Sequence, residues 1–153
     1  MRSMHGVLAL IVLQVFASVA PARAQSAADS AAIKQTALDY LEGWYQCAPD
    51  RMERAVHPDL AKRIVSNNPQ TGKDRLDEMS ALKIVQVTRG DCGGKKTSKN
   101  EQQKDITIFD VYQDMASVKV VFTGWVDYVH MATFNGRWVI VNVLRHLKPT
   151  VQK

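Results

Sequence analysis

Apolar residues in the first part of this chain recur with the period of a helix. From Ser30 to Tyr45 they are spaced at steps of three and four residues, so an amphipathic helix is predicted there. A second helix is predicted from Asp50, because an Asp at the N-cap and Glu53 three positions later form a capping box. This helix ends before His57, since the proline that follows disfavours helical backbone at that residue.

Residues 60–79 combine strand and turn signals. AKRIVS has the composition of a strand, NNPQTGK has turn chemistry, and DRLDEM follows as the returning strand of a hairpin. A helix that begins with a capping box at Thr71 and Asp74 is the alternative. The hairpin is preferred, because Ser80 is itself a good N-cap for a helix over SALKIVQVTRG that ends at Gly90.

The rest of the chain has the pattern of strands. DITIFDVYQD alternates apolar and polar residues and ends in a Gln-Asp turn. MASVKVVFTGWVDYVHMATF is too long for one flat strand, so we expect a bend or bulge at Gly124. Asn135-Gly136 predicts a type I′ hairpin turn before a last strand from Arg137 to about Leu147. About three N-terminal helices followed by a curved antiparallel sheet predict an α+β domain.

The N-terminus has the features of a secretory signal peptide. The apolar run VLALIVLQVFASVA is shorter than the ~20 apolar residues of a membrane-spanning helix, and no Cys follows it that would carry a lipid anchor. Ala22 and Ala24 are the small residues that a signal peptidase requires, so we predict cleavage between Ala24 and Gln25. An uncleaved membrane anchor is the alternative. With residues 1–24 removed, residues 25–150 form one domain of a periplasmic or secreted protein without a stable membrane anchor.

The net charge of +5 does not indicate a nucleic-acid partner. Arg2 and Arg23 leave with the signal peptide, and part of the remaining excess lies in the loop-like stretch GGKKTSKNEQQK. A nucleic-acid-binding face interleaves basic residues with aromatic ones, whereas this stretch contains no aromatic residue. We therefore expect a solvated loop there.

Cys47 and Cys92 are the two cysteines of a chain that is predicted to reach an oxidising compartment. A bond between them would close a loop of about 45 residues, which the chain-entropy model rates at about 4 kcal/mol. Pairing requires the two Cα atoms to come within bonding range, so a disulfide and two free thiols both stay open. There is no CxxC motif, Cys/His cluster or Gly-rich phosphate loop, so we expect no metal and no cofactor.

The turn at Asn135-Gly136 determines which residues share a face of the sheet. In the simplest register, the first face carries two tryptophans, a carboxyl, a methionine and an amide, namely Trp125, Asp127, Met131, Trp138 and Asn142. Asp127 then lies opposite Leu144, and the second face carries Tyr128, His130 and several valines. Both faces are too apolar for water, so helices are expected on the first and a second copy of the chain on the second. This pattern predicts a homodimer.

Three stretches of the chain together resemble a known superfamily. They are TALDYLEGWYQ followed by a capped turn and HPDL, then DEMSALKIV, and finally FNGRWVIVNVL. The arrangement resembles the nuclear transport factor 2-like superfamily, and within it the bacterial "putative lumazine-binding" proteins related to SnoaL-like polyketide cyclases. The resemblance runs from about Ala31 to Pro149 and implies a cone, in which a bent sheet wraps around the helices and an apolar pocket lies at the open end. Related chains usually have Gly-Asp after the first helix, so Cys47 is a peculiarity of this chain that favours pairing with Cys92.

The resemblance places the pocket on the first face of the hairpin, because Trp138 and Ile140 resemble the inward-pointing pair of related chains. The predicted ligand pocket joins that face to the aromatic end of the first helix. Its predicted lining is Tyr40, Trp44, Trp125, Asp127, Met131, Trp138 and Asn142.

Asp127 is the first candidate for a catalytic residue. A buried carboxyl without partners has a raised pKa, which suits a general base or acid. Its role is structural instead if it pairs with Arg145, Lys119 or His146 near a rim. His57, in a His-Pro-Asp turn, is the second candidate and has a capping or packing role as its alternative.

The superfamily hosts isomerases, dehydratases, epoxide hydrolases, cyclases and pure binding modules, so the fold alone does not give the function. The first hypothesis is an exported, homodimeric small-molecule-binding protein, whose ligand is lumazine-like or another heterocycle. The alternative is a cofactor-free acid–base enzyme, an isomerase, dehydratase or cyclase, with Asp127 as its base and Tyr40 or His57 as partner. A scaffold whose cone is filled by its own side chains is a third possibility.

Overall fold

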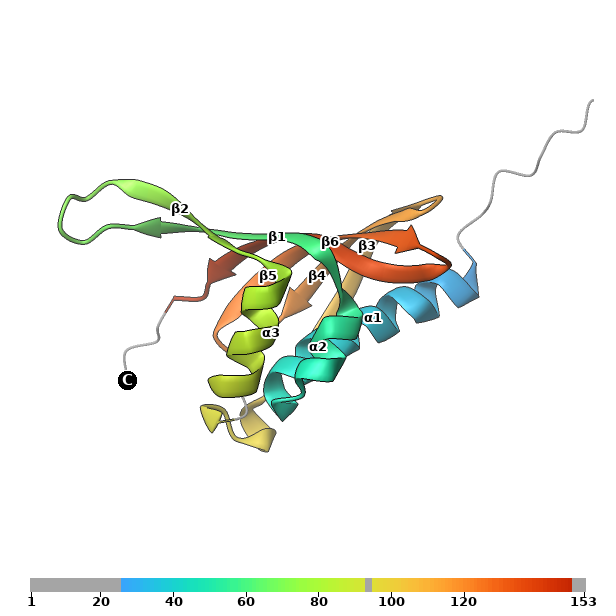
Figure 1. Ribbon diagram of the computed structural model, residues 1–153, viewed down its shortest axis with the longest axis horizontal. Coiled ribbons are helices and arrows are strands. Elements are labelled where there is room, and N and C mark those ends of the chain that lie inside the picture. The colour runs from blue at the N-terminus through green and yellow to red at the C-terminus, as the bar shows by residue number, and fades with distance from the viewer. Residues whose placement is uncertain (1–25, 93–94, 150–153) are drawn as a thin grey trace, which may run out of the picture.

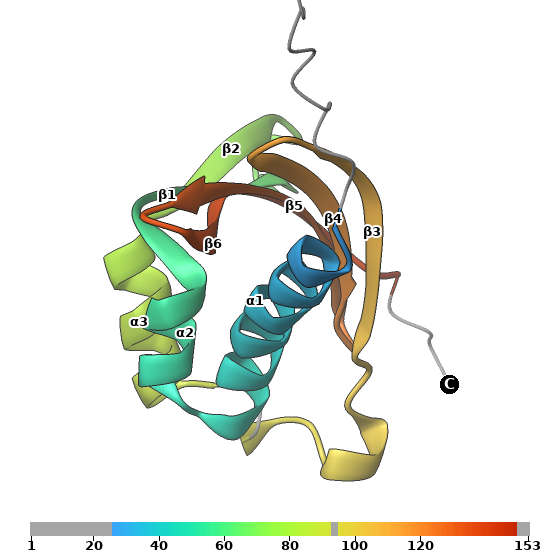
Figure 2. The same cartoon turned by 90° about the vertical axis from the view of Figure 1, so that its right-hand side faces the viewer.

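Six strands form one curved sheet, and the helices lie on its concave side (Figures 1 and 2). The computed structural model describes residues 26–92 and 95–149, so the predicted signal peptide and its cleavage site lie outside the described residues. Figure 2 shows α1 beneath the arch of the sheet, with α2 and α3 beside it. Buried apolar side chains from the helices and the inward face of the strands form one core.

The three helices begin where local capping chemistry allows. α1 spans Ala27–Gln46, because the Ser26 Oγ accepts a hydrogen bond from the Asp29 N–H at 2.9 Å; the predicted start at Ser30 was therefore late. α2 spans Pro49–Ala55 and has no side-chain cap, so the predicted capping box at Asp50 is wrong. Pro49 begins this helix instead, since its fixed φ suits the first turn. α3 spans Ala81–Gly90 and is capped by Ser80, as predicted.

The strand order is β2-β1-β6-β5-β4-β3. β1 (Val56–Asn67) and β2 (Asp74–Met79) form the predicted antiparallel hairpin, which extends beyond the helices in Figure 1. β3 (Asp105–Tyr112), β4 (Met115–Val121), β5 (Trp125–Phe134) and β6 (Arg137–Leu147) follow as an antiparallel meander, preceded by a 3₁₀ turn over Lys99–Glu101. β1 pairs with β6 in parallel, so the sheet is mixed and the expectation of a wholly antiparallel sheet fails at this one pair.

The turns follow the backbone requirements of their residues. Asn135 and Gly136 both have positive φ, at 50° and 74°, which confirms the predicted type I′ geometry. Gly124 lies in a chain reversal and not in a bend of one long strand. The Phe122 N–H donates to the Trp125 carbonyl oxygen at 2.9 Å, so β4 and β5 are two strands.

A disulfide joins Cys47 to Cys92, with their Cα atoms 5.2 Å apart. Cys47 has a φ of 56° and ends α1, whereas Cys92 follows α3 and is fully buried. The bond therefore ties the ends of two helices together beside the core. It is the pairing that the resemblance favoured.

A bulge in β6 changes the register predicted for the last hairpin. The expected pairs hold from Phe134/Arg137 to Met131/Ile140, but beyond them His130 lies opposite Asn142, which leaves Val141 as the extra residue. Asp127 therefore faces Arg145 and not Leu144. Asn142 turns to the face of His130, where its Nδ2 lies 3.1 Å from the histidine Nδ1. The prediction that Asn142 shares a face with Asp127 is wrong, because alternation along a strand does not record a bulge.

Within residues 26–92 and 95–149, no helix is long and apolar enough to cross a membrane.

Candidate functional site

Four polar side chains meet on the concave side of the sheet, where apolar residues would be expected. Tyr40 comes from the buried stripe of α1, Lys62 from β1, Asp127 from β5 and Arg145 from β6. Asp127 is 0% exposed and Lys62 is 3% exposed, so two charges lie in the interior. We refer to these four residues as the polar cluster.

Every partner in the polar cluster converges on the Asp127 carboxylate. The Tyr40 hydroxyl donates to Oδ2 at 2.6 Å, and Lys62 Nζ donates to the same oxygen at 2.7 Å. Arg145 Nε donates to Oδ1 at 3.2 Å. Lys62 Nζ also donates to the Tyr40 hydroxyl, so α1, β1 and β5 are joined through three atoms. Both oxygens of Asp127 are therefore occupied by donors of this chain.

The charges of the polar cluster set its protonation. Burial raises the pKa of Asp127, but the charges of Lys62 and Arg145 and the hydrogen bonds outweigh it and hold that pKa below its usual value. Burial lowers the pKa of Lys62 to about 7, although the Asp127 carboxylate opposes this shift. Burial, followed by the charge of Asp127, raises the pKa of the Tyr40 hydroxyl well above its usual value. Asp127 is thus an ionised acceptor and not the neutral acid that the sequence suggested for an unpaired carboxyl.

Aromatic rings adjoin the polar cluster. The Arg145 guanidinium lies 4.3 Å from the centroid of the Trp125 ring, which suits a cation–π contact. Trp125 stacks on Phe122 with centroids 4.6 Å apart and meets Trp44 edge-on at 5.7 Å. The Trp125 Nε1 is buried and has no hydrogen-bond partner among the described residues.

The residues predicted to line a ligand pocket separate in the structure. Tyr40 and Asp127 are hydrogen-bonded to each other, and Trp44 at the aromatic end of α1 contacts Trp125. Met131 and Trp138 lie in the hydrophobic core. Asn142 lies on the opposite face, for the reason given above.

Of the three partners proposed for Asp127, only Arg145 bonds to it. Lys119 lies over the Phe109 ring instead, and His146 is exposed. Lys62 is the residue that the sequence reasoning missed. The signal was available: Leu60, Lys62 and Ile64 share a face of the strand, and Leu60 is buried.

The space beside the polar cluster is small. A pocket of about 70 Å³ is bordered by Lys62 and Arg145 together with residues of the β1–β2 hairpin, namely Arg63, Ile64, Asp77, Glu78 and Met79. A water molecule in the liquid takes up roughly 30 Å³, so this pocket has room for about two waters. It does not accommodate a ring system.

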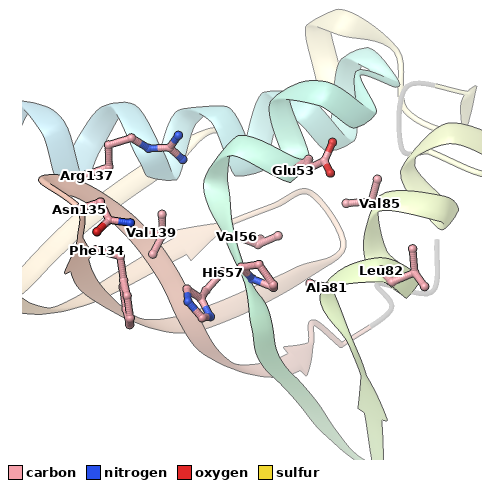
Figure 3. A pocket seen from close by; sticks show the side chains of 11 residues that line it. Glu53, Val56, His57, Ala81, Leu82, Val85, Phe134, Asn135, Arg137 and Val139 are labelled. Carbon is pink, nitrogen blue, oxygen red and sulfur yellow. The ribbon is translucent and has the colours of Figure 1, made fainter.

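A larger pocket lies between α3 and the tip of the β5–β6 hairpin (Figure 3). Its volume is about 580 Å³, and we call it the lateral pocket. Its lining comes from α2, the start of β1, the first two turns of α3 and the β5–β6 hairpin: Glu53, Val56, His57, Pro58, Ala81, Leu82, Val85, Phe134, Asn135, Arg137 and Val139. Of the residues predicted to be functional, the lateral pocket contains His57 alone.

Two polar groups of the lateral pocket, His57 and Arg137, form hydrogen bonds with the backbone. The His57 ring lies against the Phe134 ring with centroids 4.3 Å apart, and its Nδ1 accepts from the Asp59 N–H at 3.1 Å. Arg137 Nη2 donates to the Arg54 carbonyl oxygen at 3.2 Å. In Figure 3, Arg137 and Glu53 come from different walls, with Val56 and Val139 between them. The pocket thus combines an apolar floor with separate charged groups.

The convex face of the sheet carries exposed apolar side chains. Phe109 stacks on Tyr128 with ring centroids 5.9 Å apart, and Leu144 lies beside Tyr128 in the register. Tyr112 and Met115 are exposed near a second pocket of about 350 Å³ on the same side. This is the face on which the sequence predicted a second copy of the chain.

Among residues 26–92 and 95–149, no three His, Cys, Asp or Glu side chains gather closely enough to hold a metal ion.

Comparison with known proteins agrees with this architecture. The sequence profile of the family described as "Putative lumazine-binding" matches residues 28–146. Among solved structures, an NTF2-like protein of unknown function from Shewanella baltica OS155 is 16% identical with a TM-score of 0.63, covering 80% of this chain and 96% of that one. Another, from Methylobacillus flagellatus KT, is 18% identical with a TM-score of 0.60, covering 81% and 95%. The predicted nuclear transport factor 2-like fold is confirmed. The chain has no significant match among curated proteins.

Proposed function

Because this chain belongs to the family described as "Putative lumazine-binding", we propose that it is an exported, homodimeric protein that binds a small heterocyclic ligand of the lumazine type. We place the ligand in the lateral pocket and not among the residues predicted from the sequence. Tyr40, Asp127 and Met131 are fully buried in the packed interior, so a ligand there would have to displace core side chains.

The lateral pocket is the observation that carries this proposal. Its volume of about 580 Å³ falls within the roughly 300–1,000 Å³ that is usual for small-molecule sites. Phe134 and His57 offer ring faces on which a flat heterocycle can stack, and Arg137 and Asn135 supply polar groups at the rim. A mostly apolar lining with a few polar groups is the usual composition of such a site.

The homodimer is supported by the convex face of the sheet. Phe109, Tyr128 and Leu144 expose apolar surface there, and a second copy would remove it from water. Export is supported by the sequence of the first 24 residues.

A native mass spectrum of the protein from an exported fraction tests these statements together. We expect a dimer whose chains begin at Gln25 and which carries a small-molecule adduct. A chain that retains residues 1–24 would contradict export, and a monomer would contradict the dimer.

Ligand binding itself is tested by titrating the protein with lumazine in a calorimeter. Phe134→Ala should weaken binding about tenfold, because removal of one stacking ring costs roughly 1–3 kcal/mol. Leu147→Ala is the matched control, since Leu147 is also exposed on a strand but lies outside the lateral pocket and is not among the convex-face residues proposed for the dimer. Equal effects of the two variants, or no binding by the wild type, would reject the lateral pocket as a lumazine site.

A second candidate function, a cofactor-free acid–base enzyme, is favoured by Lys62. Its pKa of about 7 suits proton transfer, it bonds to Tyr40, and it borders the 70 Å³ pocket. Asp127 is the weaker base, because both of its oxygens accept hydrogen bonds from cations. The test is deuterium exchange at the α-carbon of a ketone as small as acetone, followed by NMR. Exchange that is no faster than in buffer, or that survives in a folded Lys62→Met variant, would exclude this function.

A further inference from the structure

Arg137 differs from most other arginines of the described residues in lacking a carboxylate partner. Arg51, Arg54, Arg63, Arg75 and Arg145 each lie within 4.0 Å of an Asp or Glu oxygen. Within residues 26–92 and 95–149, Arg137 makes no ion pair, and its guanidinium donates to the Arg54 carbonyl oxygen alone. One nitrogen is thereby positioned, and the other donors remain available at the wall of the lateral pocket.

We infer that the lateral pocket selects aromatic acids, whose ring lies against Phe134 and whose carboxylate pairs with Arg137. This inference rests on the proposed function and adds the charge of the ligand to it. A guanidinium presents donors in a planar fork that matches the two oxygens of a carboxylate. The pairing also supplies Arg137 with a carboxylate, which none of the described residues provides.

The arrangement of the other lining groups sets where the acid group lies. Glu53 belongs to the α2 wall and repels a carboxylate, whereas Arg137 belongs to the hairpin wall (Figure 3). The α3 wall offers Ala81, Leu82 and Val85, which have no polar side-chain atoms. An aromatic acid therefore fits in one direction, with its carboxylate at the hairpin and its apolar edge toward α3. The exposed Leu82 would then be covered by the ring.

The His57 ring adds a second polar contact to the lateral pocket, and this contact also favours an acid group on the ligand. Its Nδ1 accepts from the Asp59 N–H, so the neutral ring carries its proton on Nε2. That N–H is a donor and favours an acceptor on the ligand, as the guanidinium does. The polar side chains of the lining are thus Arg137, His57, Asn135 and Glu53, with the Asp59 carboxylate 3.8 Å from the His57 Nδ1 outside it, and the acid group is favoured on the Arg137 side.

The test compares lumazine with a lumazine that carries one ring carboxylate, at a pH below the ionisation of the parent ring. We expect the acid to bind the wild-type protein about tenfold more tightly, which corresponds to about 1.4 kcal/mol for a charged hydrogen-bonded pair. Arg137→Gln should abolish this preference, so that the two ligands bind the variant with affinities within about twofold of each other, whatever the affinity for lumazine itself becomes. Arg89→Gln is the matched control, because Arg89 is likewise exposed and without an ion pair among the described residues but lies outside the pocket. Added salt should reduce the preference in the wild type, since the pair is open to solvent.

The outcomes separate the two proposals. If both ligands bind equally well, or if the preference survives in Arg137→Gln, the selection of acids is wrong while the binding function stands. If neither ligand binds, both proposals fail. A preference that is lost in Arg137→Gln and kept in Arg89→Gln supports the inference.

Discussion

Replacement of Lys62 by methionine tests whether the polar cluster holds α1 and β1 to the centre of the sheet. Methionine keeps most of the volume of the side chain but removes its charge, so the fully buried Asp127 would retain Arg145 as its one cation. Removal of one partner from a buried ion pair costs roughly 3–5 kcal/mol, because the remaining charge is left without compensation. Since Arg145 and the Tyr40 hydroxyl still donate to Asp127, we expect the lower end, about 3 kcal/mol.

The assay is urea unfolding followed by circular dichroism at pH 6, where Lys62 is largely protonated. Lys119→Met is the control, because Lys119 lies on β4 and contacts the exposed Phe109 ring, so its loss should cost less than about 1 kcal/mol. The double variant Lys62→Met with Asp127→Leu should lose less unfolding free energy than the two single variants lose in sum, because it leaves no unpaired buried carboxylate. A loss below about 1 kcal/mol in Lys62→Met, or strict additivity in the double variant, would refute this account of the polar cluster.

Three further results are expected. The free energy of unfolding should rise between pH 7 and about 10.5, because Lys62 gives up its proton at about 7 in the folded chain while the unfolded chain still binds it. It should fall in acid, below the usual Asp pKa of 3.8, as Asp127 is protonated. Urea midpoints measured across this pH range check both changes, and the Lys62→Met variant should lack the rise at alkaline pH. Cys47→Ser together with Cys92→Ser should lower the free energy of unfolding by about 4 kcal/mol, and an unchanged urea midpoint would show that the disulfide contributes nothing. Tyr128→Glu should convert the proposed dimer into a monomer in light scattering, and a retained dimer mass would move the interface away from the convex face.

Much of the fold could be predicted because its local signals are strong. Asn135-Gly136 demanded two positive φ values, and Ser80 offered a free hydroxyl before an apolar run, so the hairpin and α3 lie where the sequence placed them. The capping box at Asp50 failed because Pro49 at the preceding position is already a good first residue of a helix. The parallel pair of β1 and β6 had no local signal, since their partners are far apart in sequence.

The sequence indicated two members of the polar cluster, Asp127 and Tyr40, but not Lys62. Asp127 stood out as a carboxylate on an apolar face, and the helical spacing of apolar residues placed Tyr40 on the buried stripe of α1. Lys62 did not stand out, because lysine between Ala61 and Arg63 looks like the polar side of an edge strand. Its burial follows from the parallel pairing with β6, which puts the middle of β1 inside the sheet. Alternation with Leu60 and Ile64 indicates the face on which Lys62 lies, but its contact with Asp127 depends on the long-range pairing.

β6 contributes residues to both candidate sites, one on each side of the bulge at Val141. Before the bulge, Arg137 and Val139 of β6 line the lateral pocket; after it, Arg145 reaches Asp127. In an unbroken register Leu144 would face Asp127, and the Arg145 guanidinium would project from the convex face. The carboxylate would then lose its bond to Arg145, and a second cation besides Lys119 would lie on the convex face. One extra residue in β6 therefore brings Arg145 to the buried carboxylate and leaves Leu144 beside Tyr128 on the convex face, while the lining of the lateral pocket stays unchanged.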